Sequence, residues 1–319
     1  MTMGAFQRDV LHDAAQLDVR LRCPRCSANL ISYDCTKCKL QLRESGGIIY
    51  ALPPERVDHY AQFIRDYERI RAEEGRGSAC DDFYLNLPYR DNSGRNGKQW
   101  RIRARTYDYV VKHLLPSSLP ASGKVLDLGA GNCWMCYRLA LAGYRTYAVD
   151  LLTNSYDGLG AAVRYQKHLP GYFPRFQAEL AHLPFQDHQF DAIVFNASFH
   201  YAEDASAVLQ EALRCATKSG IVVISDTPWY SCEESGNIMV HERRSAFLER
   251  YGTASASIES IEFLTDERLR YLEEHLAIRW SIYFPRYGLR WAMRPFWAML
   301  LQKREPAEFR IFVARKAHM

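Results

Sequence analysis

The stretch Lys124–Asp150, KVLDLGAGNCWMCYRLALAGYRTYAVD, decides the fold. An apolar run over 125–128 leads into a glycine turn, then a helix expected over 136–142 and a strand expected over 144–149. Asp150 ends that strand, 19 residues after Gly131. Glycine lets the backbone approach a ligand closely, and an acid at this offset can accept two ribose hydroxyls. The stretch therefore predicts a site for a cofactor that contains a nucleoside.

The details of the glycine turn argue against a dinucleotide. A pyrophosphate fingerprint needs a third glycine, but Cys133 stands there, and no Gly-Lys-Ser/Thr sequence of a phosphate-binding loop occurs. Asp127, two residues before Gly129, suits a cationic ligand better than a phosphate. With the pattern Asp127-x-Gly129-x-Gly131, the chain resembles the class I S-adenosylmethionine-dependent methyltransferases, whose first motif has the form acid-x-Gly-x-Gly-x-Gly. Cys133 makes the turn bulkier but leaves the backbone approach in place.

The resemblance continues downstream, in order. Ala178–Phe185 matches the third motif of that family, where an acid at the position of Glu179 holds the adenine amino group. Phe190–Asn196 matches the fourth strand, whose end faces the methyl group, and Ser219–Ser225 is similar to the fifth. The resemblance implies that the cofactor contacts Asp127, Gly129, Ala130, Gly131, Asp150, Leu151, Glu179, Leu180 and Asn196.

The same resemblance implies an α/β fold with a doubly wound, mostly parallel, Rossmann-like sheet of seven strands. Near-continuous apolar runs with helices between them are what a buried parallel sheet requires. Strands are expected at Ile278–Phe284 and Phe309–Ala314, as the sixth and seventh strands of an antiparallel end. A fold of this family that has lost its activity is the alternative, but the acids of the site are all present.

Four cysteines near the N-terminus form two C-x-x-C pairs, Cys23/Cys26 and Cys35/Cys38. Thiolates at this spacing close a tetrahedral zinc site with no open position, so the zinc is expected to be structural. Leu40–Leu42 and Ile48–Leu52 are expected to form a hairpin behind the pairs, and the module resembles a zinc ribbon. It is too small to bury a core, so the metal must supply folding free energy on the order of 10 kcal/mol.

Domain boundaries follow from these motifs. We expect a zinc ribbon over 1–54, a helical bridge or substrate cap over 55–115, and a cofactor-binding domain over 116–319 with insertions at about 231–270 and 286–306. In the bridge, Arg90 and Arg95 lie in a loop and could line the substrate mouth or simply face solvent. A solvated helix face is expected for Arg101, Arg103 and Arg105.

Candidate catalytic residues follow the fourth strand. His200 has an unperturbed pKa that suits a general base, and a buried, hydrogen-bonded histidine is the alternative. Asn196 could position an acceptor, but it lacks the following Pro-Pro-aromatic of enzymes that methylate amino groups of adenine or glutamine. Tyr201 and Trp291 are further candidates for contact with the substrate.

The segment 287–304, YGLRWAMRPFWAMLLQKR, combines four cations with aromatic residues and contains no acid. It could be a pocket lid, a membrane-surface contact, a stacking surface for nucleic acid, or a helix that packs its aromatic residues on the sheet. The chain of 319 residues has a mild net charge of +4 and no run of 18 apolar residues. Because no apolar signal segment is visible near the N-terminus, we expect a cytoplasmic protein without a spanning helix.

Three functions remain open for the chain, and two of them differ in the methyl acceptor. The Leu-Pro-Phe pattern, the mild charge and the aromatic C-terminal segment favour a small-molecule acceptor. An RNA nucleobase is the rival, because a zinc ribbon joined to this fold resembles the guanine methyltransferases of large-subunit ribosomal RNA. The third is an inactive adaptor that keeps the cofactor fold and docks through its ribbon.

Overall fold

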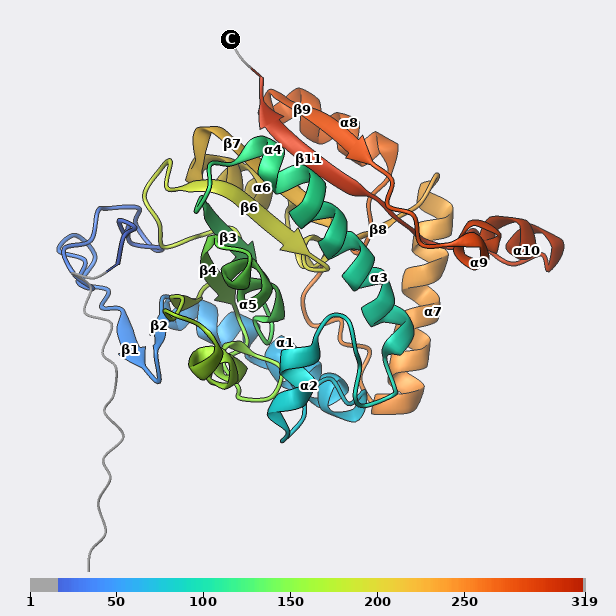
Figure 1. Cartoon of the computed structure of the whole chain (residues 1–319), viewed down its shortest axis with the longest axis horizontal. Coiled ribbons are helices and arrows are strands. Elements are labelled where there is room, and N and C mark those ends of the chain that lie inside the picture. The colour runs from blue at the N-terminus through green and yellow to red at the C-terminus, as the bar shows by residue number, and fades with distance from the viewer. Residues whose placement is uncertain (1–16, 318–319) are drawn as a thin grey trace, which may run out of the picture.

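The computed structural model describes residues 17–317 (Figure 1). Within that range one mixed sheet contains nine strands in the order β1-β2-β5-β4-β3-β6-β7-β11-β9. Its strands are β1 (Arg43–Ser45), β2 (Ile48–Tyr50), β3 (Lys124–Leu128), β4 (Arg145–Asp150), β5 (Arg175–Gln177), β6 (Phe190–Asn196), β7 (Ala216–Ser225), β9 (Ile278–Tyr283) and β11 (Ile311–Lys316).

The sheet is mostly parallel, which confirms the predicted fold class. Strands β2, β5, β4, β3, β6 and β7 pair in parallel, whereas β11 pairs antiparallel with both β7 and β9. The expected antiparallel end is therefore present. Strands β5, β4, β3, β6, β7, β11 and β9 form the seven-stranded part that the sequence predicts.

The two additional strands come from the hairpin β1–β2, which extends the sheet at the edge of β5. Strand β2 pairs in parallel with β5, with Ile48 opposite Arg175. The first strand of the hairpin begins later than the expected Leu40–Leu42, because the backbone of that segment bonds within the cysteine loops. Leu40 accepts a hydrogen bond from the Cys35 backbone, and Leu42 donates one to Tyr33. Leu40 and Leu42 belong to the same apolar core as residues of β3 and β6. The domain boundary near residue 54 stays a prediction.

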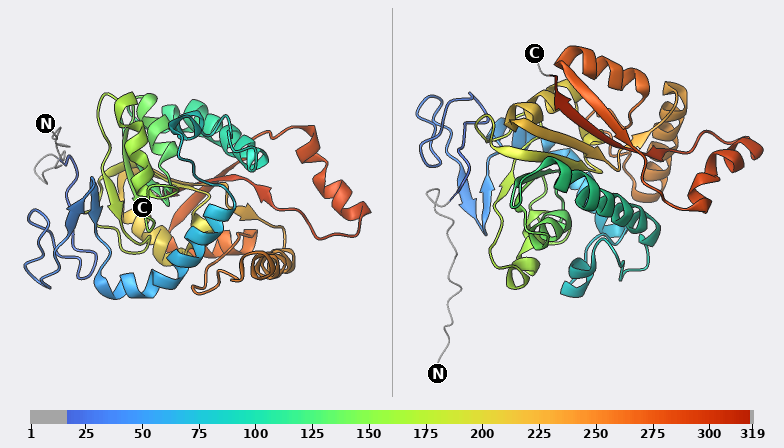
Figure 2. Two further views of the ribbon diagram at one scale, coloured as in Figure 1. Left: turned by 90° about the horizontal axis from the view of Figure 1, so that it is seen from below. Right: turned by 45° about the horizontal axis from the view of Figure 1, so that its top comes forward.

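Helices cover both faces of the sheet (Figures 1 and 2). Alternate residues of β3 point to opposite sides, so Leu126 and Leu128 join one apolar core while Val125 joins the other. The first core contains the ribbon, α6 (Ala205–Cys215) and α8 (Asp266–Leu276). The second contains α2 (Asp81–Asn86), α3 (Gly97–Tyr109), η2 (Val110–Leu114), α4 (Leu115–Ser118), α5 (Trp134–Leu141) and η3 (Leu159–His168).

Several elements surround the carboxyl ends of the parallel strands, namely α1 (Pro54–Glu73), η4 (Phe199–Tyr201), α7 (Glu233–Tyr251) and the short pair β8 (Pro228–Trp229) and β10 (Glu308–Phe309). Residues 287–304, called the arm below, carry α9 (Leu289–Ala292) and α10 (Arg294–Leu300) and project from the body in both views of Figure 2. None of the helices in residues 17–317 combines the length and the apolar character needed to span a bilayer.

Candidate cofactor site and adjoining cavity

The first cavity, of about 110 Å³, opens at the carboxyl ends of β3, β4 and β6. This is where open α/β sheets bind ligands. Eight of the nine residues that the sequence assigns to the cofactor line it: Asp127, Gly129, Ala130, Gly131, Asp150, Leu151, Leu180 and Asn196. The ninth, Glu179, does not.

The glycine turn has the backbone geometry that its sequence predicts. Gly129 has a φ of +75°, and a Cβ atom there would lie 2.3 Å from the Cβ of Ser198. Gly131 has a φ of +52°. Cys133, in place of the third glycine, also adopts a left-handed φ of +63° immediately before α5. A non-glycine residue pays roughly 1–2 kcal/mol for this conformation, so the turn keeps its shape at some cost in stability.

Two acids face the first cavity from β3 and from the end of β4: Asp127, which is buried, and Asp150, which is partly buried. Burial raises the pKa of Asp127 to about 7, and the nearby charge of Asp150 adds to the effect. Burial also raises the pKa of Asp150 to about 6, although backbone donors oppose it. These donors are the N–H groups of Gly131, at 2.7 Å, and Leu152, at 2.8 Å. They fix the carboxylate while leaving lone pairs for further hydroxyl groups.

Glu179 instead lines a separate, third cavity, next to α1. Its carboxylate accepts hydrogen bonds from Arg56, at 2.6 Å, and from the hydroxyl of Tyr60, at 3.1 Å. His182 lies 3.1 Å from its other oxygen. Burial alone would raise the pKa of Glu179, but the bonds from His182 and Arg56 hold it below its usual value. The carboxylate of Glu179 is thus already bonded to side chains of α1 and to His182 of its own loop.

Sequence reasoning missed a third acid at this site, Asp157. It accepts hydrogen bonds from Arg71 and, at 3.2 Å, from the side chain of Asn132. All three residues line the first cavity. Only Asn132 lies within the glycine motif, and Asp157 follows β4 in a loop with no strand or helix period to mark it.

Aromatic side chains from α1, α3, η4 and α5 line the first cavity. Phe63 and Tyr67, from the apolar stripe of α1, pack against Tyr201 with ring centres 6.2 and 5.5 Å apart. Trp100 of α3 and Trp134 of α5 meet edge to face at 5.8 Å. The candidate substrate residue Tyr201 therefore lies at the boundary of the cavity, where α1 covers the strand ends.

A second cavity, of about 280 Å³, adjoins the first. The two share part of their lining, including Tyr67, Arg103, Ala197 and Tyr201. Beyond that boundary the second cavity is lined by polar and charged side chains from the segment after α1, from η4, from the end of β7, from α7 and from the loop before α8: Glu74, Arg76, His200, Asp226, Arg243 and Glu262. A molecule here would lie next to whatever occupies the first cavity.

Arg103 lies where the two cavities meet, so the expectation of a solvated helix face is wrong for this residue. Its guanidinium stacks over Trp100 at 4.9 Å. Among the described residues it forms no ion pair or hydrogen bond. Burial lowers its pKa to about 10, and the charges of Arg76 and Arg71 contribute. It remains a cation at neutral pH; the charge of Asp226, which also lines the second cavity, acts on its pKa in the opposite direction. Its helix neighbours Arg101 and Arg105 are exposed, as expected.

Arg90 and Arg95 line neither cavity. Arg90 is exposed in its loop. The side chain of Arg95 packs beside Gly75 and lies 3.4 Å from the backbone oxygen of Glu73.

His200 lines the second cavity, but its electrostatic setting differs from that of a free histidine. Burial lowers its pKa to about 3, helped by the charges of Arg243 and Arg103. The ring is therefore neutral, and its Nδ1 atom has no hydrogen-bond partner among residues 17–317. Asn196 lines the first cavity and donates to Ser225 at 3.0 Å and to Asp226 at 2.9 Å.

Trp291 lies outside both cavities but touches a residue that lines the second one. Its ring stacks on Phe309, with ring centres 5.6 Å apart, and Phe309 lines the second cavity. Trp291 thus supports the cavity wall from the base of the arm.

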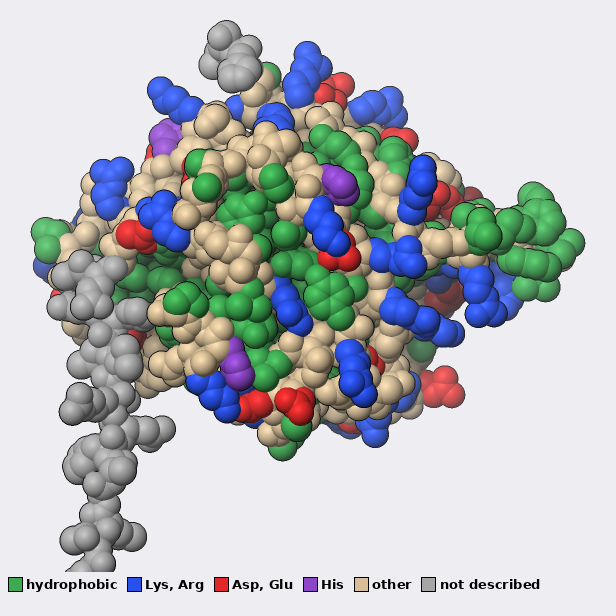
Figure 3. Space-filling view, viewed as in Figure 1, with side chains coloured by type: hydrophobic (Ala, Val, Ile, Leu, Met, Phe, Trp, Pro, Cys, Tyr) green, Lys and Arg blue, Asp and Glu red, His purple; other side chains and the backbone are tan. Residues whose placement is uncertain are grey.

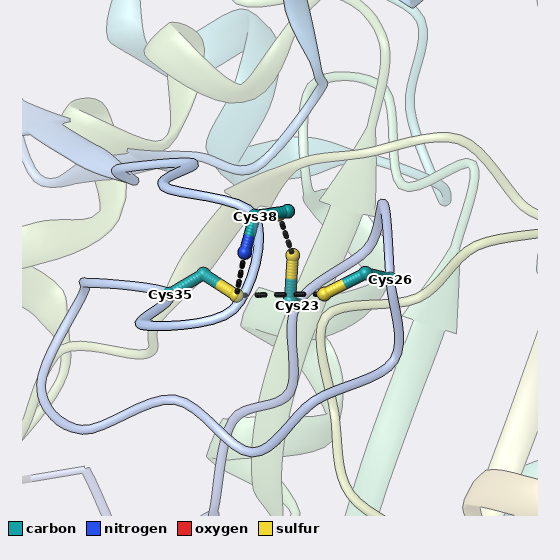
Figure 4. Close-up of side chains that lie close together, drawn as sticks. All are labelled: Cys23, Cys26, Cys35 and Cys38. Atoms are coloured by element: carbon teal, nitrogen blue, oxygen red, sulfur yellow. Dashed lines mark hydrogen bonds between the residues drawn. The ribbon is translucent and has the colours of Figure 1, made fainter.

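The four N-terminal cysteines come together as predicted (Figure 4). All four sulfur atoms lie within 4.8 Å of one another, and the pairs Cys23/Cys38 and Cys26/Cys35 are 3.5 Å apart. A tetrahedral zinc–thiolate site with bonds of about 2.3 Å has sulfur–sulfur distances of roughly 3.8 Å. The four thiols therefore fit one zinc ion. Cys133 and Cys136 are buried apart from this cluster, and burial raises the pKa of both thiols, which agrees with packing.

Residues 126–224 match the family described as a methyltransferase domain. The matched segment covers less than a third of the chain. It contains β3 through most of β7, together with the glycine turn and the three acids of the first cavity. No curated protein matches the chain.

Solved structures of methyltransferases resemble the chain at low sequence identity. YcgJ from Bacillus subtilis is 14% identical, with a TM-score of 0.48 over 68% of this chain and 100% of its own. Magnesium protoporphyrin IX methyltransferase from Synechocystis PCC 6803, with bound SAH, is 17% identical, with a TM-score of 0.48 over 82% and 98%. An S-adenosylmethionine-dependent methyltransferase from Mesorhizobium loti is 16% identical, with a TM-score of 0.43 over 66% and 98%.

Proposed function

We propose that this chain transfers a methyl group from S-adenosylmethionine to a small acceptor that carries an acidic group. The observation that carries the proposal is the pair of adjoining cavities, which share Tyr67, Arg103, Ala197 and Tyr201. One is lined by acids at the glycine turn, and the other contains an unpaired cation.

The first cavity suits the cofactor by its charges. Asp150, oriented by two backbone N–H groups, can accept the ribose hydroxyls. Asp127, when ionised, places negative charge near a ligand whose sulfonium and amino groups are positive, whereas the charge of Asp157 is paired with Arg71. Bound S-adenosylmethionine supplies an activated methyl group. The protein has then to hold the acceptor in line with it, and such positioning contributes several kcal/mol to catalysis.

The second cavity suits an anionic acceptor. An acidic group could form the close ion pair that Arg103 does not form with any residue in 17–317, although the charge of Asp226 acts on it. A planar guanidinium binds a carboxylate or phosphate through two parallel hydrogen bonds. Burial is the main cause of the low pKa of His200, and the charges of Arg243 and Arg103 add to it. The same anion would offset only the contribution of these two charges. In the loaded site His200 would be a better proton acceptor than in the free protein.

Transfer of labelled methyl from the cofactor into fractionated cell extract, with and without ribonuclease, tests this proposal. We expect a small, acidic, ribonuclease-resistant product. Arg103→Ala should reduce its formation by roughly 100-fold, because the acceptor loses a charge-assisted pair, while affinity for S-adenosylmethionine changes less than about threefold. Arg101→Ala, exposed on the same helix, is the matched control.

Three other results would contradict the proposal in different ways. Label in ribonuclease-sensitive material would assign RNA as the acceptor. Cofactor binding without any labelled product would indicate the inactive adaptor. Loss of cofactor binding in Arg103→Ala would assign this side chain to the cofactor and not to the acceptor.

A further inference from the structure

The arm exposes an unusual amount of apolar surface. Seven of its large apolar side chains are between 43% and 86% exposed: Leu289, Met293, Phe296, Trp297, Met299, Leu300 and Leu301. Figure 3 shows apolar side chains gathered at the tip of the arm, on the right of the view, with basic side chains beside them. Contiguous apolar surface of this kind marks an interaction site in a soluble domain.

The arm is anchored at its base and free at its tip. Trp291 stacks on Phe309, and the hydroxyl of Tyr287 lies 2.9 Å from Thr106 of α3. Arg294 donates to the backbone oxygen of Ala307 at 2.6 Å. By contrast, neither α9 nor α10 contains a buried residue. The fold therefore holds the arm out without covering its apolar face.

The charge of the arm restricts what can cover it. It carries Arg290, Arg294, Lys303 and Arg304 and no acid. Arg304 pairs with Glu242 of α7. Within residues 17–317, Arg290 and Lys303 have no ion-pair partner. Exposed apolar and aromatic residues flanked by unpaired cations are the pattern of helices that lie in the interface of an anionic bilayer.

We propose that the arm docks on an anionic lipid surface, with the apolar side chains of α10 in the head-group region and Arg290 and Lys303 at the lipid phosphates. A second copy of the chain is the less favourable occupant, because two arms face to face would bring their unpaired cations together without a compensating acid. An anionic lipid supplies that compensation. Because Trp291 stacks on Phe309, docking would also hold the second cavity close to the lipid surface.

Co-sedimentation of the full chain with vesicles tests this proposal, which does not depend on the proposed methyl transfer. We expect binding to vesicles of phosphatidylcholine with phosphatidylglycerol, and at least roughly tenfold weaker binding to phosphatidylcholine alone. The double variant Trp297→Ser/Leu300→Ser should lose roughly tenfold or more of that affinity, since both side chains would no longer enter the lipid. Arg290→Glu/Lys303→Glu should weaken binding only to the anionic vesicles.

Ile31→Ser is the matched control, because Ile31 is 74% exposed in the ribbon, away from the arm. It should bind like the unmodified chain, and circular dichroism should show that all variants remain folded. Equal vesicle binding by the Trp297→Ser/Leu300→Ser variant would overturn the proposal. So would self-association in lipid-free sedimentation that this variant abolishes, since that result assigns the apolar face to a second copy.

Discussion

The ribbon and the arm are two short, apolar-rich segments at opposite ends of the molecule, and the fold treats them in opposite ways (Figure 1). In the ribbon, Leu21, Leu40 and Leu42 are between 3% and 8% exposed and belong to the core of one sheet face. In the arm, neither helix buries a residue. Both segments are rich in apolar residues, so an apolar composition alone does not distinguish a segment that completes a core from one that is offered to a partner.

The difference comes from what each segment can pair with inside the chain. The ribbon is joined to the rest of the sheet domain by backbone hydrogen bonds, among them one of 3.1 Å from Arg22 to Pro184, and by the parallel pairing of β2 with β5. Within residues 17–317, the contacts of the arm with the body lie around its base, at Tyr287, Trp291, Arg294 and Arg304. Stability should therefore depend strongly on the ribbon and weakly on the tip of the arm.

Loss of the metal site should have the largest effect. We expect one zinc ion per chain by elemental analysis, and a much lower content in Cys35→Ser. Because the metal supplies folding free energy on the order of 10 kcal/mol to such a module, this variant should unfold its ribbon and lower the melting temperature of the whole domain. Cys80→Ser, at an exposed cysteine outside the cluster, should change neither. A metal-free chain with an intact ribbon would refute the site.

Truncation of a leucine in the ribbon should have the second largest effect on stability. Leu42→Ala removes a side chain that is 3% exposed, so we expect a loss of about 2–5 kcal/mol in the free energy of unfolding, measured by urea denaturation. A loss below about 1 kcal/mol would show that the ribbon does not share the core of the sheet.

Cofactor affinity should depend on pH through Asp127 and Asp150, the two acids of the first cavity with raised pKa values. The raised pKa of Asp127, about 7, leaves it mostly protonated at pH 6. A cationic ligand favours the ionised form, so affinity should rise by roughly fivefold to tenfold from pH 6 to 7.5, and Asp150 should add to the change at the acidic end. Calorimetry at several pH values measures this. Asp127→Asn should remove most of the dependence, and a dependence that survives in this variant would assign it to another group.

The matched substitution in the arm should have the smallest effect. Leu300→Ala removes the same side-chain atoms as Leu42→Ala, but from a residue that is 61% exposed. We expect a change within about 0.5 kcal/mol in the same urea titration. A loss comparable to that of Leu42→Ala would mean that the arm packs on the body in solution, and the contrast between the two segments would fail.

Local sequence patterns predicted the parts of the site that lie within one strand–turn–helix–strand unit. Asp127, Gly129, Gly131 and Asp150 stand at spacings set by that unit, and backbone geometry alone brings them together. The two cysteine pairs were predictable for a similar reason, because thiols need a fixed spacing to share one metal ion.

Side chains placed by distant partners were not predictable in this way. Glu179 matches its motif, yet its orientation depends on Arg56, which lies 123 residues earlier in the chain. Arg103 and the exposed Arg101 lie two positions apart on α3, and only the packing of that helix decides which of them reaches a cavity. The additional strands β1 and β2 likewise depend on a pairing with β5 that no local pattern records.

The central claim is that the first cavity binds S-adenosylmethionine through Asp150, and calorimetric titration of the cofactor tests it most directly. The unmodified chain should bind one equivalent. Asp150→Ala should bind roughly 10–100-fold more weakly, because the ribose loses a charge-assisted acceptor worth about 1–3 kcal/mol. Asp58→Ala, at an exposed acid of α1, should bind as the unmodified chain does. Absence of binding by the unmodified chain, or equal affinity in Asp150→Ala, would contradict the account.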